Sequence, residues 1–249
     1  MPGTSSGVSR LVRRATAELL GTAFLVAAVI GSGIAAQQLS PHDTGLQLLE
    51  NSVATGAVLV ALILALQPVS ASFNPVVTVV ERALGRINSS DAAVLVLAQV
   101  VGGVTGAVVA NLMFDLDAVS ISTHHRATSG HLLGEVVATL GLVVVVFGAL
   151  RSRRIEAVAL AVGGYITAAY WFTSSTSFAN PAVTIARTLS DTFAGIEPAS
   201  MPAFVLMQLV GGALGTGAVL LLHAGVSEAV VLPGTTTPDT RRLMSEESP

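Results

Sequence analysis

The sequence feature that most constrains the fold is a short motif that occurs twice, each time after a long apolar run. Residues 72–78 read SFNPVVT, and residues 177–184 read SFANPAVT. Asparagine is a favourable helix N-cap and proline suits the first helical position, so each copy predicts the start of a helix. A helix from Pro75 to Leu84 would be about 15 Å long, roughly half the thickness of a bilayer hydrocarbon core. We therefore predict two half-spanning helices that longer helices must enclose.

Long apolar runs supply those enclosing helices. Apolar residues make up 52% of the chain and charged residues 11%, and the charges avoid the runs. Runs of about 20 apolar residues without a polar face predict transmembrane helices. Six such runs lie at residues 11–36, 48–66, 92–114, 132–150, 155–172 and 201–224. The expected fold class is an all-α membrane protein with six transmembrane helices and two re-entrant half-helices.

The arginines predict the orientation in the membrane. With six spans, ten of the twelve basic residues fall on the side that holds both termini, and only Arg126 and Arg187 fall on the other. The positive-inside rule then places both termini in the cytoplasm of a multi-pass protein of the plasma (inner) membrane.

The two halves of the chain repeat each other. Glu18-x-x-x-Thr22 is matched by Glu135-x-x-x-Thr139, and we expect each glutamate to pair with the threonine of its own motif. The stretch 99–103 (QVVGG) is matched by 208–212 (QLVGG). An odd number of spans in each repeat inserts the halves in opposite directions, and such inverted repeats place their site where the interrupted segments meet.

The chemistry of that meeting point favours a passive path for polar, uncharged solutes. Helix N-termini and the amides of Asn74 and Asn180 offer hydrogen-bond donors and partial positive charge, which oppose cations and protons. The alternative is a proton-coupled secondary transporter that uses the intramembrane carboxylates Glu18 and Glu135. The chain has no cysteine, no metal-ligand cluster, no nucleophile–base set and no basic stripe for nucleic acid. We therefore expect no enzyme, no cofactor, no metal and no nucleic-acid partner.

These residues resemble the aquaporin (major intrinsic protein) family over nearly all of the chain, from Glu18 to about His223. The twin Asn-Pro-Ala motif of the family is represented by two triplets, Asn74-Pro75-Val76 and Asn180-Pro181-Ala182. The resemblance implies one pore per subunit, a homotetramer, and buried Glu18 and Glu135 that hold the backbone of the half-helix loops. It divides the chain into a disordered tail (1–10), a channel domain (11–224, with repeats at about 11–114 and 131–224) and a second disordered tail (225–249).

The departures from the family concern the outer constriction. Val183 follows the second motif where water- and glycerol-conducting members carry an arginine, whereas Val76 for alanine is a mild change. Counting in the manner of the family places the other constriction positions at Ala54, Ala168 (or Thr167) and Ser177. A constriction of small uncharged residues favours solutes larger than water: undissociated metalloid acids, glycerol, urea or ammonia.

Five further residues lie toward the outer side of the predicted membrane protein. Arg187 lies on the same helix face as Val183, so it is a candidate for the outer vestibule or an interfacial arginine. Tyr170 and Trp171 are interpreted as interfacial anchors. The pair His124-His125 is interpreted as part of a surface loop.

Overall fold

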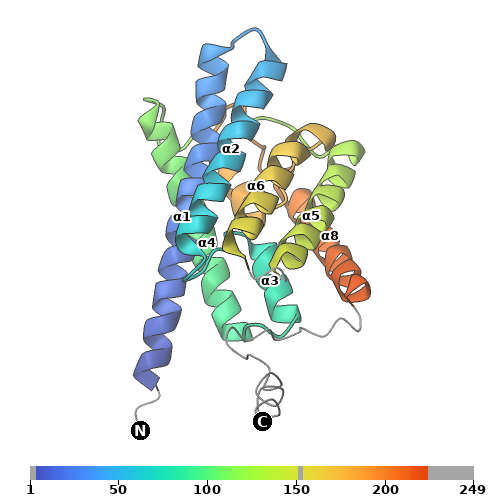
Figure 1. The fold of residues 1–249 in the computed structure, drawn as a ribbon. Coiled ribbons are helices and arrows are strands. Elements are labelled where there is room, and N and C mark those ends of the chain that lie inside the picture. The colour runs from blue at the N-terminus through green and yellow to red at the C-terminus, as the bar shows by residue number, and fades with distance from the viewer. Residues whose placement is uncertain (1–3, 151–153, 224–249) are drawn as a thin grey trace, which may run out of the picture.

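The computed structural model describes residues 4–150 and 154–223, and its regular structure over these ranges is entirely helical. Six long helices accompany two short ones (Figure 1). The helices are α1 (Thr4–Leu39), α2 (Thr44–Leu66), α3 (Pro75–Ala83), α4 (Ser89–Met113), α5 (Ser129–Leu150), α6 (Ile155–Phe172), α7 (Pro181–Ala186), the 3₁₀ helix η1 (Arg187–Leu189) and α8 (Met201–Leu222).

The long helices match the expected spans. Five of the described helices, α1, α2, α4, α5 and α8, are long and apolar enough to cross a bilayer. The sixth, α6, has 18 residues and begins next to residues 151–153, which are not described. At 1.5 Å per residue it is about 27 Å long, close to the thickness of a hydrocarbon core.

One boundary differs from the sequence-based expectation. Residues 4–10, which we expected to be disordered, form the first turns of α1, and this helix extends beyond its neighbours at one end of the bundle (Figure 1). This segment is rich in serine, but it lies directly before an apolar run in helical register, so the helix propagates backward into it. The C-terminal tail lies outside the described residues.

The packing of the helices follows the inverted repeat. Helix α1 packs on α4 and α2, and in the same way α5 packs on α8 and α6. The short helices cross over between the halves, because α3 contacts α8 as well as α4, and α7 contacts α4 as well as α8. Each half therefore completes the other, as an interrupted-helix repeat requires.

Glycines set the closest helix pairs. A Cβ atom added at Gly102 or Gly106 of α4 would lie 2.3 or 2.2 Å from a backbone carbonyl oxygen of α1. A Cβ atom added at Gly211 or Gly215 of α8 would lie 2.5 or 2.9 Å from a carbonyl oxygen of α5. Only residues without a side chain permit this approach, which the small-residue pattern of both helices predicts.

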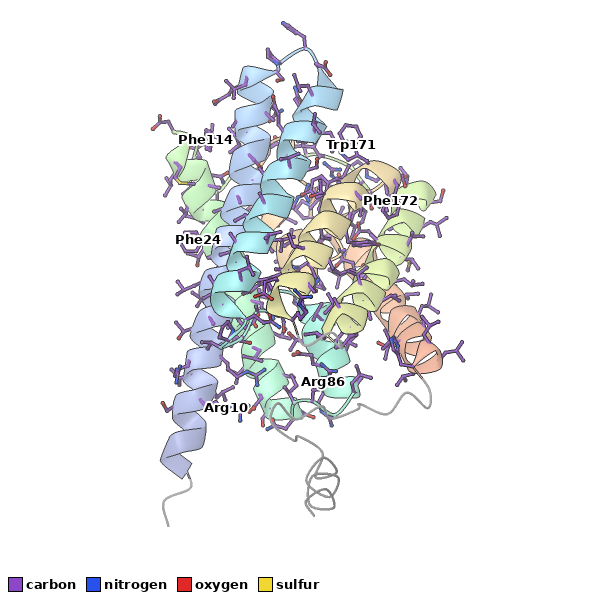
Figure 2. All side chains as sticks on the ribbon, viewed as in Figure 1. Arg10, Phe24, Arg86, Phe114, Trp171 and Phe172 are labelled. Carbon is purple, nitrogen blue, oxygen red and sulfur yellow. The ribbon has the colours of Figure 1, made fainter. Side chains whose placement is uncertain are left out.

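The two ends of the bundle differ in residue type. Helix α1 begins and α8 ends at the same end (Figure 1), and Arg10 and Arg86 lie toward this end (Figure 2). Phe114, Trp171 and Phe172 lie toward the opposite end (Figure 2). We call these the arginine end and the aromatic end.

Candidate functional site: a cavity between two half-helices

The two asparagines join the half-helices to each other. Asn74 Oδ1 accepts a hydrogen bond from the backbone N–H of Val76 at 2.9 Å, and Asn180 Oδ1 accepts one from Ala182 at 3.0 Å. These are the N-caps that the sequence predicts. Each side-chain amide also donates across the repeat: Asn74 Nδ2 to Ala179 O, and Asn180 Nδ2 to Phe73 O, both at 2.7 Å.

The backbone before each asparagine has an unusual conformation. Phe73 has φ 49° and Ala179 has φ 47°, in the left-handed region that non-glycine residues seldom adopt. These two residues provide the carbonyl oxygens that the opposite asparagine binds. Such a conformation costs about 1–3 kcal/mol per residue and persists only where the surroundings enforce it. The strain occurs at equivalent positions of both repeats, so it belongs to the architecture of the site.

A buried carboxylate enforces the first of these loops. Glu18 is fully buried and accepts hydrogen bonds from the backbone N–H groups of Ser72 and Phe73, at 2.9 and 2.7 Å, and from the Ser70 hydroxyl. Gln99 Nε2 donates to Glu18 at 2.8 Å and to Thr78 Oγ1 of α3 at 2.8 Å.

The second repeat builds the same network. Glu135 accepts from the backbone N–H groups of Phe178 and Ala179, both at 2.9 Å. Gln208 Nε2 donates to Glu135 at 2.6 Å and to Thr184 Oγ1 of α7 at 2.8 Å. Both carboxylates thus satisfy loop N–H groups that would otherwise be buried without partners.

One detail of this network corrects the sequence analysis. We expected Glu18 and Glu135 to pair with Thr22 and Thr139, four residues further along the same helix. Both threonine hydroxyls lack a hydrogen-bond partner within the described ranges. The loop N–H groups and the glutamines bind the carboxylates instead. The matched Gln99 and Gln208 were visible as a repeat, but nothing in the sequence gave them this role.

A cavity of about 270 Å³ is lined by both asparagines. Toward the arginine end its lining includes Arg14, Gln67 and Glu81, and on the other side of the asparagines it includes Tyr170 and Arg187. Part of the wall is the polar loop 69–74 with both asparagines. Most of the lining that comes from α1, α2, α5 and α6 is apolar: Leu25, Val29, Leu59, Ile63, Leu142, Val146, Leu150, Val158, Val162 and Ile166.

Two of the four expected constriction residues lie elsewhere. Ser177 and Val183 line the cavity, but Ala54 is half-buried outside the lining and Ala168 is exposed on the outer surface of α6. Thr55 and Tyr170 occupy the corresponding parts of the wall, and their hydroxyl oxygens lie 3.2 Å apart. Each residue turns a helix by about 100°, so an error of one or two positions moves a side chain to another face.

We had expected a constriction made of small residues without an aromatic side chain. This expectation is wrong, because Tyr170 is part of the cavity lining. Tyr170 is 3% exposed and lines the cavity, so it is not an interfacial anchor. Trp171 is 50% exposed near the aromatic end, as an anchor would be (Figure 2).

Arg187 lies in the cavity wall and not at the lipid interface. It is 2% exposed, its Nε donates to Ala194 O, and its guanidinium lies 3.4 Å from the centroid of the Phe178 ring. Arg126 approaches the same ring at 5.3 Å. A buried arginine thus lines the cavity one helical turn beyond Val183.

The valine of the first motif has a packing reason. A Cβ atom added at Gly212 would lie 2.5 Å from Cγ1 of Val76. The absence of a side chain at Gly212 therefore leaves room for the valine. At the equivalent place in the other repeat, Gly103 packs on the backbone of Ala182.

Loops cover the aromatic end of the cavity. The α4–α5 loop pairs with η1 through hydrogen bonds from Ser120 N to Leu189 O and from Ser122 N to Thr188 O, both 3.0 Å. The histidines of this loop pair with carboxylates, His125 with Glu197 and His124 with Asp191 at 3.9 Å. Within the described ranges, no group of three or more histidines and acidic residues is arranged to hold a metal ion.

Inverted halves, two capped half-helices that meet at their N-termini, and a cavity beside them define an integral membrane protein with the aquaporin fold. The chain belongs to the major intrinsic protein family, whose family model matches residues 5–157.

Comparison with individual proteins agrees with this assignment. The chain is 50% identical to aquaglyceroporin AqpS of Rhizobium meliloti over 202 residues, which are 81% of this chain and 86% of that protein. It is 28% identical to aquaporin Z of Photorhabdus laumondii over 233 residues, covering 86% and 99% of the two chains. The aquaglyceroporin structure from Plasmodium falciparum matches with a TM-score of 0.64 at 19% identity, covering 90% of this chain and 98% of the other, which supports the fold.

Proposed function

We propose that this protein is a passive channel for water and small uncharged solutes, and that the cavity beside the asparagine pair is the conduction path. The observation that carries the proposal is the mixed lining of the cavity. The half-helix loops contribute polar groups and both asparagines, and the long helices contribute mostly aliphatic side chains. A solute with hydroxyl or amide groups on a small carbon frame matches both kinds of lining.

The charges along the path support exclusion of cations. Arg187 adds a buried positive charge to the lining, and no carboxylate forms an ion pair with it within the described residues. Each asparagine amide has two N–H groups, and only one of them donates to the opposite loop. The second N–H of each amide can donate to a passing oxygen. A neutral solute gains these hydrogen bonds, whereas a cation meets donors and a fixed positive charge.

The solute class that we propose is wider than water. Val183 leaves a short apolar side chain at the position expected to constrict the path, and a relative with half of its residues in common is named an aquaglyceroporin. Glycerol and similar polyols, urea, ammonia and undissociated metalloid acids of the arsenous type are the candidates. Tyr170 sets an aromatic limit on the width that the sequence alone did not show.

A proton-coupled transporter is less well supported. Neither Glu18 nor Glu135 lines the cavity, and both carboxylates are occupied by loop N–H groups and a glutamine. A group that relays protons needs access to the path. These carboxylates act as fixed acceptors for the loops.

The setting of the channel is part of the proposal. We place it in the plasma (inner) membrane with both termini in the cytoplasm, because the arginines concentrate at that end. We expect a homotetramer with one path per subunit, as the family resemblance implies.

The test is stopped-flow light scattering on purified protein in proteoliposomes, with gradients of water, glycerol, urea and undissociated arsenous acid in turn. We expect glycerol flux well above that of protein-free vesicles and the same with or without a proton gradient. Flux no greater than that of empty vesicles for every solute would refute the channel. Flux that requires a pH gradient would favour the transporter.

A further inference from the structure

The cavity wall holds a cation, Arg187, on the aromatic side of the asparagine pair, and no carboxylate of the described residues forms an ion pair with it. Arg187 is only 2% exposed, and within the described part of the chain its guanidinium has one hydrogen-bond acceptor, Ala194 O. Guanidinium has five N–H donors in a planar fork. A buried charge is costly unless it is paired, so the remaining donors create a demand for an acceptor in the cavity.

A second polar group with an unmet hydrogen bond lies beside it. Ser177 is 3% exposed, lines the same cavity, and its hydroxyl has no partner among the described residues. It directly precedes Phe178, whose ring carries the Arg187 guanidinium at 3.4 Å from its centroid. Ser177 has φ 50°, so the loop keeps a left-handed conformation at the residue that presents this hydroxyl.

The neighbouring charges leave this chamber positive. Arg126 lies 5.3 Å from the centroid of the same Phe178 ring and donates to the carbonyls of Gly195 and Phe193, so it adds a second positive charge beside Arg187. Glu135 is the carboxylate behind the Phe178 backbone, and it is bound by two loop N–H groups and Gln208. Two guanidinium groups against one carboxylate give a net charge of at least +1.

We propose that this chamber, lined by Arg187, Ser177 and Tyr170, is a binding site for a small carboxylate-type monoanion, which occupies the conduction path and blocks neutral solutes while it is bound. A planar anion with two oxygens accepts both prongs of the guanidinium fork, and a hydroxyl at its side completes the site. A spherical anion such as chloride cannot use the fork, so geometry as well as charge selects the ligand. The predicted block of flux rests on the proposed conduction path, whereas the predicted binding of the anion does not.

The experiment measures binding and flux separately, with sodium formate as the probe and sodium chloride at equal ionic strength as the reference. Formate is the smallest such monoanion and is ionised at pH 7. Isothermal titration of the detergent-purified protein reports binding. Stopped-flow glycerol flux in proteoliposomes, expressed as the ratio in formate to that in chloride, reports blocking, and this ratio is independent of each variant's basal flux.

Three variants make the test specific. Arg187→Met removes the charge with similar length, and it should weaken formate binding by at least about tenfold, the loss of one charge-assisted hydrogen bond or more. Ser177→Ala keeps the charge and should weaken binding by a smaller factor. Arg86→Met removes an arginine at the arginine end, over the Phe147 ring and outside the cavity lining, and should leave formate binding unchanged.

The outcomes separate this inference from the proposed channel function. Formate binding that disappears in Arg187→Met but persists in Arg86→Met supports the site. If Arg187→Met does not fold, a weaker affinity of Ser177→Ala for formate supports the site instead. Absence of formate binding to the wild-type protein, or equal affinity in wild type and Ser177→Ala together with equal block of flux, overturns the site. A protein that conducts no solute but binds formate through Arg187 would refute the channel and keep the site.

Discussion

Single hydrogen bonds at the asparagine pair hold the two halves of this protein together at their centre. Each side-chain amide caps its own half-helix with the oxygen and binds the opposite loop with the nitrogen. A residue in this position must accept and donate at once, which restricts the choice to an amide. The pair therefore links folding to the presentation of donors in the cavity.

The first prediction concerns this requirement. Asn180→Asp replaces the donor facing Phe73 O by a carboxylate oxygen, and a buried uncompensated charge costs on the order of 3–5 kcal/mol. We expect loss of folded protein or of glycerol flux, measured by size-exclusion yield and stopped-flow scattering. The same substitution at Asn88, an exposed N-cap of α4, should change neither, because aspartate caps equally well. Unchanged flux in folded Asn180→Asp would show that the amide donor is dispensable.

The second prediction concerns the width of the path beside Arg187. Val183→Arg adds a planar guanidinium to the cavity wall and should narrow the path. Water can still pass by accepting one of the new donors, whereas a polyol loses the space it needs. The ratio of glycerol flux to water flux should therefore fall at equal protein abundance. A ratio that stays the same in the folded variant would remove Val183 from the selectivity region.

The residues of the wall show where sequence reasoning ends. The motif identified Asn74, Asn180 and Val183, because a cap and its next turn have fixed geometry. Counting along the long helices failed at Ala168, since rotation about a helix axis is set by packing that the sequence does not display. Tyr170 lies inside because it meets Thr55 of α2, a contact between residues 115 positions apart.

At the scale of elements, glycines determine the distances between helices, and loops determine the structure at the aromatic end. The glycine faces of α4 and α8 determine how closely the helix pairs of each repeat approach. This part of the fold was predictable, because small residues at close spacing in a membrane helix indicate a packing face. At the aromatic end, the α4–α5 loop is hydrogen-bonded to residues 188–197, and we call this contact the clasp. The clasp was not predictable, because it depends on pairs of residues more than 60 positions apart.

The third prediction tests the α5–α8 contact. Gly211→Ala places a Cβ 2.5 Å from Val136 O, so the helices must separate. Overpacking of this kind costs about 1–3 kcal/mol, and the melting temperature should fall by several degrees in a detergent unfolding scan. Gly217→Ala on the same helix meets no atom within 4 Å and should be neutral or slightly stabilising. Equal melting temperatures for the two variants would contradict the close approach.

The fourth prediction concerns the clasp. Hydrogen bonds from the His125 ring and the Ser200 hydroxyl lower the pKa of the Glu197 carboxyl below its ordinary value of 4.5. A lowered pKa in the folded state means that the carboxylate stabilises the fold above pH 4.5, and that this contribution is lost as the pH falls through the lower value. Glu197→Gln should therefore melt below wild type at pH 7, with the difference shrinking as the pH falls below 4.5.

The control for the clasp is Asp117→Asn, which changes an exposed carboxylate of the α4–α5 loop, the loop that carries His125. We expect no pH-dependent difference between this variant and the wild type. A difference for Glu197→Gln that grows toward acid pH would have the wrong sign and would exclude the clasp as described.

At the scale of the whole molecule, the structure consists of two repeats built from the same parts. Each repeat contributes three long helices, one half-helix, a buried glutamate with its glutamine, and an asparagine that reaches into the other repeat. The repeat itself was readable from the sequence because the motif, the glutamates, the glutamines and the glycines recur in the same order, although the pairing of glutamate with glutamine was not. The symmetry is broken in the cavity, where Arg187 is present in one half only, and this break carries the proposed selectivity.

The central claim is that the cavity beside the asparagine pair is the conduction path, and the absence of cysteine from the chain offers a direct test. Val162 lines the cavity, whereas Ala168 lies exposed on the outer surface of the same helix. The measurement is glycerol flux through Val162→Cys proteoliposomes before and after benzyl methanethiosulfonate, and again after a thiol reductant. We predict a block that the reductant reverses, with no effect on the wild type or on Ala168→Cys. Unaltered flux through Val162→Cys that is fully labelled would contradict the claim, since a path through this cavity cannot remain open with a benzyl group in it.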